Sequence, residues 1–333
     1  MPKLSRKGIQ LPTSPIRKLV NHSDDAKARG IDVLHLNIGQ PDIAAPKEAI
    51  NAIQKTQLKL LPYGPSQGTH TYRKKLCVYY KKNEIEVSPE DIIVTTGASE
   101  ALIFTLNVIC DAGDEIIIPE PFYANYNGFA SSAGVNVVPV ISEFTSQFEL
   151  PPLENITGKI TTKTKAILLC NPSNPTGYVY NEKEISTLCE LAIKYDIFLI
   201  VDEVYREFIY GGNKHYSVLK YPGGSEHTVM IDSVSKRYSL CGARVGCIVS
   251  KNHMFIQNVL KFAHLRLSPP SIALIASEAA LDAPDSYLKE VVAEYEVRRS
   301  VLIEYLEKIP NVKVSHPIGA FYCIVKLPVE DAE

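Results

Sequence analysis

Short apolar runs rich in isoleucine and valine recur along the chain and predict buried strands. Seven such runs occupy residues 92–94, 115–118, 135–140, 165–170, 197–201, 228–231 and 245–249. They are nearly continuous rather than alternating, which is the pattern of strands covered on both faces. Between several of them lie stretches of helical periodicity, including 99–110 and 182–195, the latter with Asn181 as its expected N-cap. The order predicts an α/β fold built on a large, doubly wound, mostly parallel, seven-stranded sheet.

Both ends of the chain differ from this central region. Residues 1 to about 40 are irregular, residues 287–309 predict a long charged amphipathic helix, and residues 312–314 and 321–327 predict strands. We therefore expect a large ligand-binding domain over residues 40–285. A smaller α+β domain is expected from the two chain ends, residues 1–39 and 286–333.

Composition narrows the class of protein. The 333 residues are 45% hydrophobic and 22% charged with a net charge of -2, which favours neither nucleic acid nor an acidic membrane surface as a partner. The seven cysteines have no metal-ligand spacing, so no metal site is expected. Their odd number in apolar settings, together with the absence of a signal peptide or membrane-spanning stretch, predicts a cytoplasmic protein.

The residues that follow each strand carry the candidate chemistry, because ligands of open α/β sheets lie beyond the carboxyl ends of the strands. After the first strand, Gly97, Ala98 and Ser99 open a helix, where small residues and free amides bind an anion. Ser99 as a simple N-cap is the alternative. No GxGxxG pattern occurs, which disfavours a dinucleotide site.

The strands at 115–118, 165–170 and 197–201 are followed by an aromatic, an amide and an acid, respectively. Tyr123 is placed to stack on a flat ring, although core packing explains it equally well. The sequence NPSNPTG at 171–177 predicts a rigid turn that presents a side-chain amide. Asp202 ends an apolar strand, where a carboxylate is costly unless it is paired, for example with a cationic ring nitrogen. Its alternative role is a helix N-cap.

A lysine follows the 228–231 strand. Lys236 lies among small hydroxyl residues such as Ser233 and close to basic groups, which lowers the pKa of a lysine and suits Schiff-base chemistry. Arg244 adds a planar guanidinium for phosphate or carboxylate. Five strand ends thus supply an anion cup, an aromatic, an amide, an acid and a lysine, which together suit one phosphorylated pyridine aldehyde.

This set resembles the class I/II aminotransferases among fold-type I pyridoxal-phosphate enzymes, and in particular aspartate aminotransferases. The resemblance runs from the sequence LNIGQPD at 36–42 to GAFY at 319–322. Its most specific matches are NPSNPTG at 171–177 and SxSKxxxxxGxRxG at 233–246. It implies that the 40–285 domain binds pyridoxal 5'-phosphate.

The resemblance also implies a role for each candidate residue. Lys236 would carry the cofactor covalently and later move the substrate's α-proton, and Asp202 would keep the pyridine nitrogen protonated. The other implied cofactor contacts are Asn174 and Tyr205 to the phenolic oxygen, Tyr123 on the ring, and Gly97, Ala98, Ser99, Ser233, Arg244 and a neighbouring subunit's Tyr63 to the phosphate. Gly39 and Asn174 are the implied substrate contacts.

The implied activity is transfer of an amino group from an L-amino acid, aspartate first, to a 2-oxo acid such as 2-oxoglutarate, by a homodimer with shared active sites. Two departures from the family stand out. The family continues for several dozen residues beyond 319–322 and places an arginine there for the substrate α-carboxylate, so we expect the small domain to be truncated at Glu333. Some aspartate-selective relatives have a lysine where this chain has Ser99, which leaves the distal-carboxylate contact unassigned.

Two other functions stay open on these residues. A pyridoxal-phosphate-dependent C–S β-lyase would use the same lysine, acid and phosphate cup, but it would need no 2-oxo acid. A non-catalytic regulator on the same fold usually has a basic DNA-binding domain ahead of it, which is not found here. Candidates for substrate selection are Ile16, Ile38 and residues 264–268.

Overall fold

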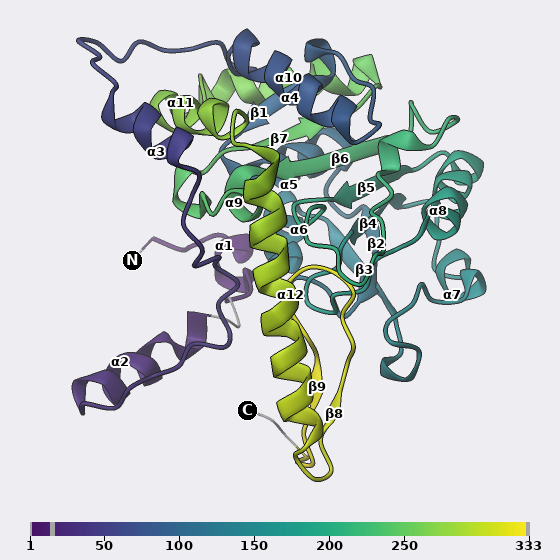
Figure 1. Cartoon of the computed structure of the whole chain (residues 1–333). Coiled ribbons are helices and arrows are strands. Elements are labelled where there is room, and N and C mark those ends of the chain that lie inside the picture. Colours follow the sequence, from purple (N-terminus) through teal and green to yellow (C-terminus); the bar gives the residue numbers. More distant parts are fainter. Residues whose placement is uncertain (1, 14–16, 331–333) are drawn as a thin grey trace.

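The computed structural model, which describes residues 2–13 and 17–330, is built around a seven-stranded sheet (Figure 1). The strands lie in the order β1-β7-β6-β5-β4-β2-β3. Their bounds are β1 Ile92–Thr95, β2 Glu115–Glu120, β3 Asn136–Ile141, β4 Thr164–Cys170, β5 Phe198–Asp202, β6 Thr228–Ser233 and β7 Gly246–Val249. Only β7 is antiparallel to its neighbours, β1 and β6. The mostly parallel sheet predicted from the sequence is confirmed.

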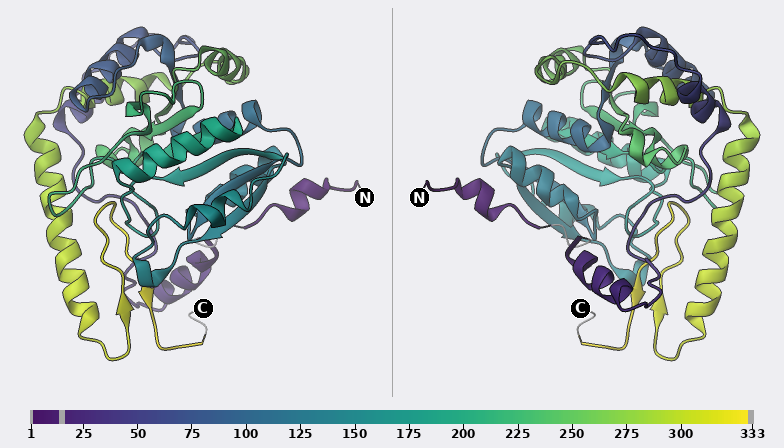
Figure 2. Two further views of the ribbon diagram at one scale, coloured as in Figure 1. Left: turned by 90° about the vertical axis from the view of Figure 1, so that its right-hand side faces the viewer. Right: turned by 90° about the vertical axis from the view of Figure 1, so that its left-hand side faces the viewer.

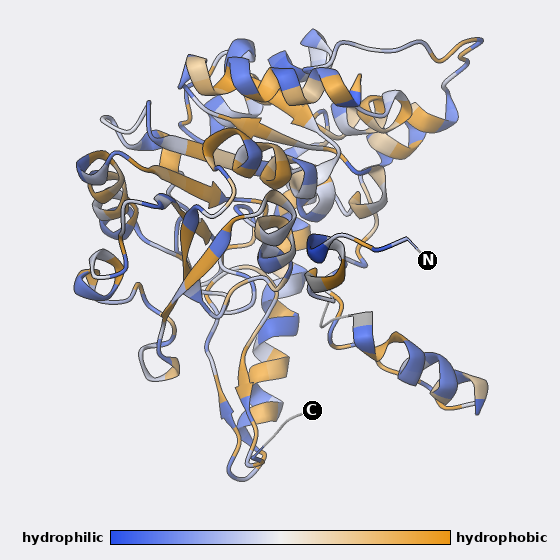
Figure 3. Cartoon of the chain, turned by 180° about the vertical axis from the view of Figure 1, so that it is seen from behind, coloured by the Kyte–Doolittle hydropathy of each residue, from blue (hydrophilic) through white to orange (hydrophobic). Residues whose placement is uncertain are grey.

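Helices cover both faces of the sheet, because successive strand residues point to opposite sides. In β2, Ile117 packs into one core cluster while Ile116 and Ile118 pack into the other. The first cluster is completed by α4 (His70–Lys82), α8 (Glu182–Tyr195) and α11 (Ser271–Ala280), and the second by α5 (Gly97–Ile109), α6 (Asn125–Ala133), α10 (His253–Arg266) and α12 (Asp285–Glu307). Figure 3 shows the apolar strands inside and more polar helix surfaces outside.

Helix α8 begins as its sequence predicts. The Asn181 side chain accepts a hydrogen bond from the Glu184 amide at 3.1 Å, and the Glu184 carboxylate accepts one from the Asn181 amide at 2.8 Å. This reciprocal capping satisfies two amides that the first helical turn leaves without partners. It starts the helix directly after the 171–180 segment and so helps to hold that segment at the end of β4.

The remaining elements lie around this body. They are α1 (Arg6–Gln10), α2 (Val20–Ala28), α3 (Lys47–Gln54), α7 (Leu153–Thr157), α9 (Val234–Arg237), β8 (Lys313–Val314) and β9 (Val325–Lys326). Helices α1 and α2 project from the body, and α12 runs from the sheet to the β8–β9 hairpin (Figures 1 and 2). Across the described residues, every helix is too short or too polar to span a bilayer.

The strand predicted over 321–327 is wrong for most of its length, since only Val325–Lys326 pairs with β8. Ala320 has a φ of 53°, in the left-handed region, which ends any extended backbone there. The rings of Phe321 and Tyr322 then pack on Tyr205 at centroid distances of 5.2 and 5.5 Å. Aromatic residues read as strand formers therefore belong to a loop that reaches the ends of β4 and β5. The predicted 287–309 helix is confirmed as α12.

Candidate active site

The carboxyl ends of β1, β2, β4, β5 and β6 lie along one edge of the sheet, as the parallel order requires. The residues chosen from the sequence follow these ends. Gly97 begins α5, Tyr123 precedes α6, Asn174 lies in the loop after β4, Asp202 ends β5, and Lys236 lies in α9 after β6. The fold thus gathers side chains from positions more than a hundred residues apart.

Lys236 is half-buried with its amine directed at a backbone carbonyl. Its Nζ donates to the Gly39 carbonyl at 2.6 Å, and it lies 5.8 Å from the Tyr205 ring centroid and 6.0 Å from that of Phe321. Burial lowers the pKa of the Lys236 amine, and nearby Arg244 acts in the same direction. A lowered pKa raises the fraction of neutral amine, which is the form that attacks a carbonyl carbon.

The loop that carries Lys236 is held by a buried ion pair. Arg237 donates to the Asp232 carboxylate at 2.8 Å, and Tyr80 donates to the same oxygen at 2.8 Å. Burial disfavours the charge on Asp232, but Arg237 and Arg206 outweigh it and hold the pKa of this carboxyl below its usual range. Because Asp232 and Arg237 bracket Ser233 and Lys236, the pair fixes the short α9 turn between them.

Asp202 is a buried carboxylate that ends β5 at only 5% exposure. It accepts hydrogen bonds from the Tyr126 hydroxyl at 2.9 Å and from the Val204 amide at 3.3 Å. Burial raises its pKa to about 6, against the opposing effect of these two donors. Within residues 2–13 and 17–330 no cation forms a salt bridge with it. Asp202 therefore offers a negative charge to a cationic ligand group.

Asn174 and Tyr205 face each other across the ends of β4 and β5. The Asn174 amide donates to the Tyr205 hydroxyl at 3.4 Å. The other asparagine of the 171–177 loop, Asn171, is fully buried and binds the backbone of Tyr180 and Tyr216. Asn171 thus shapes the loop and leaves Asn174 as the amide that faces the site.

A small cradle lies at the start of α5. Gly97 has a φ of +75°, and a Cβ there would lie 2.4 Å from a terminal guanidinium nitrogen of Arg244. A Cβ at Gly246 would lie 2.7 Å from the Ala98 amide nitrogen. The glycines at 97 and 246 therefore let Arg244 and the first turn of α5, which carries Ala98 and Ser99, approach closely. A cationic fork beside a helix N-terminus is suited to a phosphate.

Ser233 is already engaged by its own loop. Its hydroxyl donates to the Val245 carbonyl at 2.8 Å, lies 2.8 Å from the Ser235 hydroxyl and accepts from the Ser235 amide. It therefore caps α9, in addition to lying beside the cradle. Ser235, which the sequence interpretation passed over, shares this network.

Besides Tyr205, the two other predicted tyrosines occupy different environments. Tyr123 packs edge-on against Tyr126 with centroids 5.4 Å apart, and its hydroxyl accepts from the Asn125 amide at 2.8 Å. Tyr63 is 80% exposed on the segment before α4. Of the candidates for substrate selection, Ile16 lies outside the described residues and Ile38 is 52% exposed.

The stretch 264–268 begins in the last turn of α10. Arg266 in this stretch binds the Glu100 carboxylate at 3.1 Å and the Ser66 carbonyl at 2.9 Å. It thereby ties the end of α10 to the first turn of α5 and to the segment around residue 66. Leu265 beside it is 82% exposed.

Besides Ser235, sequence reasoning missed two further hydroxyls of the site, those of Tyr126 and Tyr322. Tyr126 lies in the first turn of α6, three residues after Tyr123, a spacing that places both on one side of a helical turn. Tyr322 was quoted only as part of GAFY and received no role. Its hydroxyl lies 2.7 Å from that of Tyr205.

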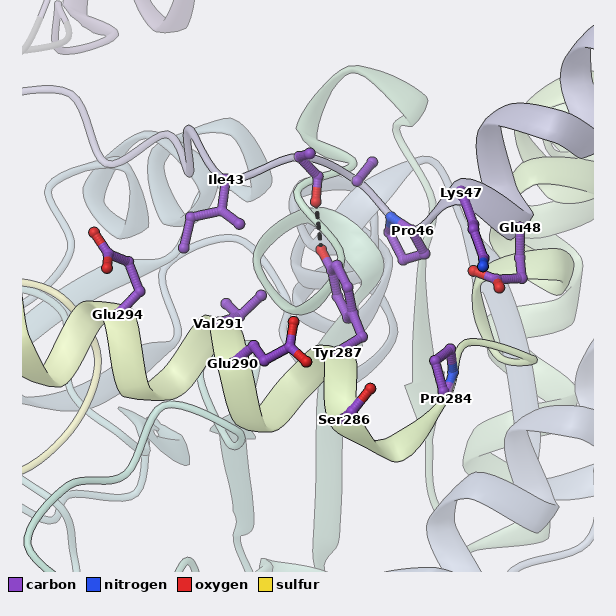
Figure 4. Close-up of a pocket in the computed structure, with 12 residues that line it drawn as sticks. Ile43, Pro46, Lys47, Glu48, Pro284, Ser286, Tyr287, Glu290, Val291 and Glu294 are labelled. Carbon is purple, nitrogen blue, oxygen red and sulfur yellow. Dashed lines mark hydrogen bonds between the residues drawn. The ribbon is translucent and has the colours of Figure 1, made fainter.

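A separate surface groove of about 390 Å³ lies between residues 43–48 and the start of α12 (Figure 4). The Tyr287 hydroxyl crosses it to donate to the Ala44 carbonyl at 3.0 Å. Further along α12, Arg298 pairs with Asp42 at 2.6 Å. These two contacts fasten the segment that carries Gly39 to α12.

Comparison with known families decides the class. Residues 31–333 match the model of the family described as aminotransferase class I and II. The chain belongs to this family. Its enzymes depend on pyridoxal phosphate, so the protein is a pyridoxal-phosphate-dependent aminotransferase. The family, enzyme class and cofactor expected from the sequence are confirmed.

Individual relatives agree with this class. The aspartate aminotransferase of Bacillus subtilis is 34% identical over 323 residues, which are 96% of this chain and 82% of that protein. Among solved structures, aspartate aminotransferase from Thermus thermophilus with maleate aligns with a TM-score of 0.90 at 29% identity, covering 98% of this chain and 85% of that one. Alanine aminotransferase from Pyrococcus furiosus aligns with a TM-score of 0.92 at 30% identity, covering 99% and 85%.

The residues of the site fit pyridoxal phosphate on two observations. The buried Asp202 carboxylate has neutral hydrogen-bond donors and suits a protonated ring nitrogen. The cradle of Gly97 and Arg244, which a single Cβ would fill, suits the phosphate group. Lys236, on the neighbouring α9, has the kind of amine with which an aldehyde of this cofactor would react.

Proposed function

We propose that the aminotransferase takes L-aspartate as amino donor and 2-oxoglutarate as acceptor, with Lys236 as the residue that carries the cofactor. The single observation behind the site assignment is the half-buried Lys236 amine with a lowered pKa, beside the buried Asp202. Aspartate is supported by the names of relatives such as that of Bacillus subtilis. The alanine aminotransferase neighbour makes alanine the first competing donor to test.

In this proposal each residue has a defined task. Bound pyridoxal phosphate supplies the electron sink that accepts the electrons left on the substrate Cα. Lys236 would remove the proton from the substrate Cα as a neutral amine and return it to the C4′ carbon of the cofactor, acting as general base and then as general acid. Asp202 keeps the ring nitrogen protonated by electrostatic attraction in a site of low polarity.

The remaining residues bind and orient. Arg244, Ser233 and the amides of 97–99 would hold the phosphate, and Asn174 and Tyr205 would hydrogen-bond the phenolic oxygen. Tyr123 would stack on the ring. Gly39, whose carbonyl accepts from Lys236, would lie against the substrate carboxylate together with Asn174.

We further propose a cytoplasmic homodimer in which Tyr63 of one chain reaches the phosphate of the other. The exposure of Leu34 at 80%, Leu36 at 92%, Leu60 at 79% and Tyr63 at 80% supports a partner over this region. The seven free cysteines support a reducing compartment. The division into residues 40–285 and residues 1–39 with 286–333 is supported by the sheet, which lies wholly within the first range.

The proposal is tested by the absorbance spectrum of the purified protein loaded with pyridoxal phosphate. Without any acceptor, aspartate should bleach the visible band of the lysine-bound cofactor, and 2-oxoglutarate should restore it. Lys236→Ala should lose the band and slow the half-reaction by about 10²-fold or more. The matched control Lys261→Ala, on the exposed side of α10, should keep both.

Other outcomes have clear meanings. Bleaching by alanine but not by aspartate would overturn the proposed substrate and leave the role of Lys236 standing. Pyruvate and ammonia released from a thioether amino acid without any 2-oxo acid would indicate lyase chemistry instead. An unchanged band in Lys236→Ala would refute the assignment of the lysine.

A further inference from the structure

The residue that the proposed mechanism leaves without a task is Tyr322. Its hydroxyl oxygen lies 2.7 Å from that of Tyr205, and the two rings meet edge to face at 83°. Tyr205 is itself only 3% exposed. Either hydroxyl can donate in this contact, so its direction decides whether the Tyr205 proton is used by Tyr322 or is left for another partner.

The loop that carries Tyr322 is fastened to the site on several sides. The Ile318 and Gly319 amides both donate to the Gly177 carbonyl, at 3.0 and 2.9 Å, and the Ala320 amide donates to the Phe208 carbonyl at 2.9 Å. A Cβ at Gly177 would lie 3.0 Å from the Tyr322 carbonyl oxygen. Tyr322 therefore has a fixed backbone, anchored to the same 171–177 loop that presents Asn174.

The side chain of Tyr322 is confined as well. A Cβ at Gly39 would lie 1.8 Å from the Tyr322 hydroxyl oxygen, so glycine is the residue that admits this hydroxyl. The Gly39 carbonyl in turn accepts from Lys236. The Tyr322 hydroxyl is thus enclosed between Gly39 and Tyr205, next to the groups proposed for catalysis.

The hydrogen-bond capacity of Tyr205 shows what this contact does. A phenol hydroxyl has one proton to donate and two lone pairs to accept with. The Asn174 amide donates to one lone pair at 3.4 Å. When the Tyr322 hydroxyl donates to the other lone pair of Tyr205, the single proton of Tyr205 is left for a third partner. The two hydrogen bonds that Tyr205 accepts then polarise its O–H bond and strengthen its donation to that third partner.

We propose that Tyr322 is a positioning residue that acts through Tyr205. By donating to the Tyr205 hydroxyl, Tyr322 directs the Tyr205 proton to the phenolic oxygen of the cofactor and strengthens that hydrogen bond. This inference rests on the proposed role of Tyr205. Stronger donation to the phenolic oxygen stabilises its anionic form, which lowers the pH midpoint at which the visible band of the lysine-bound cofactor titrates.

The titratable groups that face Tyr205 are Tyr322, Asp202, Cys170 and Lys236. Burial, followed by the nearby Tyr322 hydroxyl, raises the pKa of Tyr205 well above its ordinary value. Burial likewise raises the pKa of Tyr322. Both hydroxyls stay protonated across the neutral range, so each retains a proton to donate while the band titrates.

The test is a pH titration of the visible band in the loaded enzyme. Tyr322→Phe removes one hydroxyl and keeps the ring, and it should move the midpoint upward by roughly 0.2 to 0.7 pH unit, a fraction of the effect of one charge-assisted hydrogen bond. Tyr205→Phe should move it upward by about 1 unit or more. In the Tyr205→Phe background, Tyr322→Phe should add nothing, because the proposed effect passes through Tyr205.

Tyr210→Phe is the matched control. The Tyr210 hydroxyl donates to the Ala320 carbonyl, so this variant loosens the same loop without touching Tyr205, and it should leave the midpoint in place. Three outcomes would each overturn the inference. They are an equal shift of the midpoint in Tyr210→Phe, an unchanged midpoint in Tyr322→Phe, and a full additional shift when Tyr322→Phe is added to Tyr205→Phe. Tyr322→Leu gives a second variant without the hydroxyl should Tyr322→Phe fail to fold. A wild-type protein with no visible band would instead refute the proposed function itself.

Discussion

Tyr126→Phe is the substitution whose effect follows most directly from the geometry. Tyr126 is 1% exposed and donates to the Asp202 carboxylate at 2.9 Å, and Asp202 is 5% exposed. A hydrogen bond to a buried charged group stabilises it by about 2 kcal/mol. Its loss should raise the pKa of Asp202 from about 6 by a further 1 to 2 units or so, since one unit equals about 1.4 kcal/mol.

The sign of the pH dependence follows from this raised pKa. Burial already places the pKa of Asp202 above its ordinary value of 3.8, so between the two values the folded state binds more protons than the unfolded state. Stability of the cofactor-free protein therefore falls as pH rises through this window. In Tyr126→Phe the pKa of Asp202 is higher still, so the window extends to a higher pH. At pH 5 Asp202 is mostly protonated in both proteins, and the variant loses about the contribution of one neutral hydrogen bond. At pH 8 Asp202 is charged in the wild type, and the variant loses the larger contribution of a hydrogen bond to a charged group.

Urea denaturation of the cofactor-free protein at pH 5 and pH 8 measures this difference. Tyr126→Phe should lower the free energy of unfolding relative to wild type, and the loss should be about 1 to 2 kcal/mol larger at pH 8 than at pH 5. The control Tyr210→Phe removes a buried hydroxyl that donates to a neutral carbonyl, so its cost should be equal at both pH values. The reasoning fails if the cost of Tyr126→Phe is also independent of pH.

Two further predictions concern the phosphate cradle and the buried ion pair. In Gly97→Ala the new Cβ would lie 2.4 Å from the Arg244 guanidinium and should displace it. The affinity for pyridoxal phosphate, measured by fluorescence titration, should fall about tenfold or more. The control Gly242→Ala has open space around the new Cβ and should keep the wild-type affinity. Asp232→Asn should lower the free energy of unfolding by about 3 to 5 kcal/mol, because it leaves the buried Arg237 charge without its ion-pair partner. A loss near zero in urea denaturation would contradict the conclusion that this ion pair holds the α9 turn in place.

The sequence was most informative where function depends on the end of a strand. Asp202 and Lys236 could be found because each ends or follows an uninterrupted apolar run, and such runs identify the strands of a parallel sheet. Once the strands are placed, their order puts these residues at one edge. Gly97 was found in the same way, as a small residue at the turn beside this edge, whereas the close approach of the chain at Gly246 is seen only in the structure.

Contacts that join distant segments could not be found in that way. Tyr126 lies 76 residues before Asp202, and nothing in the helical pattern of α6 indicates that its hydroxyl reaches the sheet edge. Phe321 and Tyr322 have the composition of a strand, yet the tertiary contacts of 318–320 with Gly177 and Phe208 turn them into the site. Local propensity was outweighed here by packing, because two aromatic rings are better buried against Tyr205 than exposed on a short hairpin.

One physical property of the site prepares both of its principal ionisable groups. Burial disfavours charge, so it lowers the pKa of the Lys236 amine and raises that of the Asp202 carboxyl to about 6. The first effect raises the fraction of neutral Lys236 amine, and the second gives a carboxyl that gains stability from a cationic partner. The rings of Tyr205 and Phe321 lie within 6.0 Å of the Lys236 amine and form part of its apolar surroundings. Water admitted past these rings would return the pKa of the Lys236 amine toward its ordinary value, so the loop at 321–322 helps to maintain the lowered pKa of this amine.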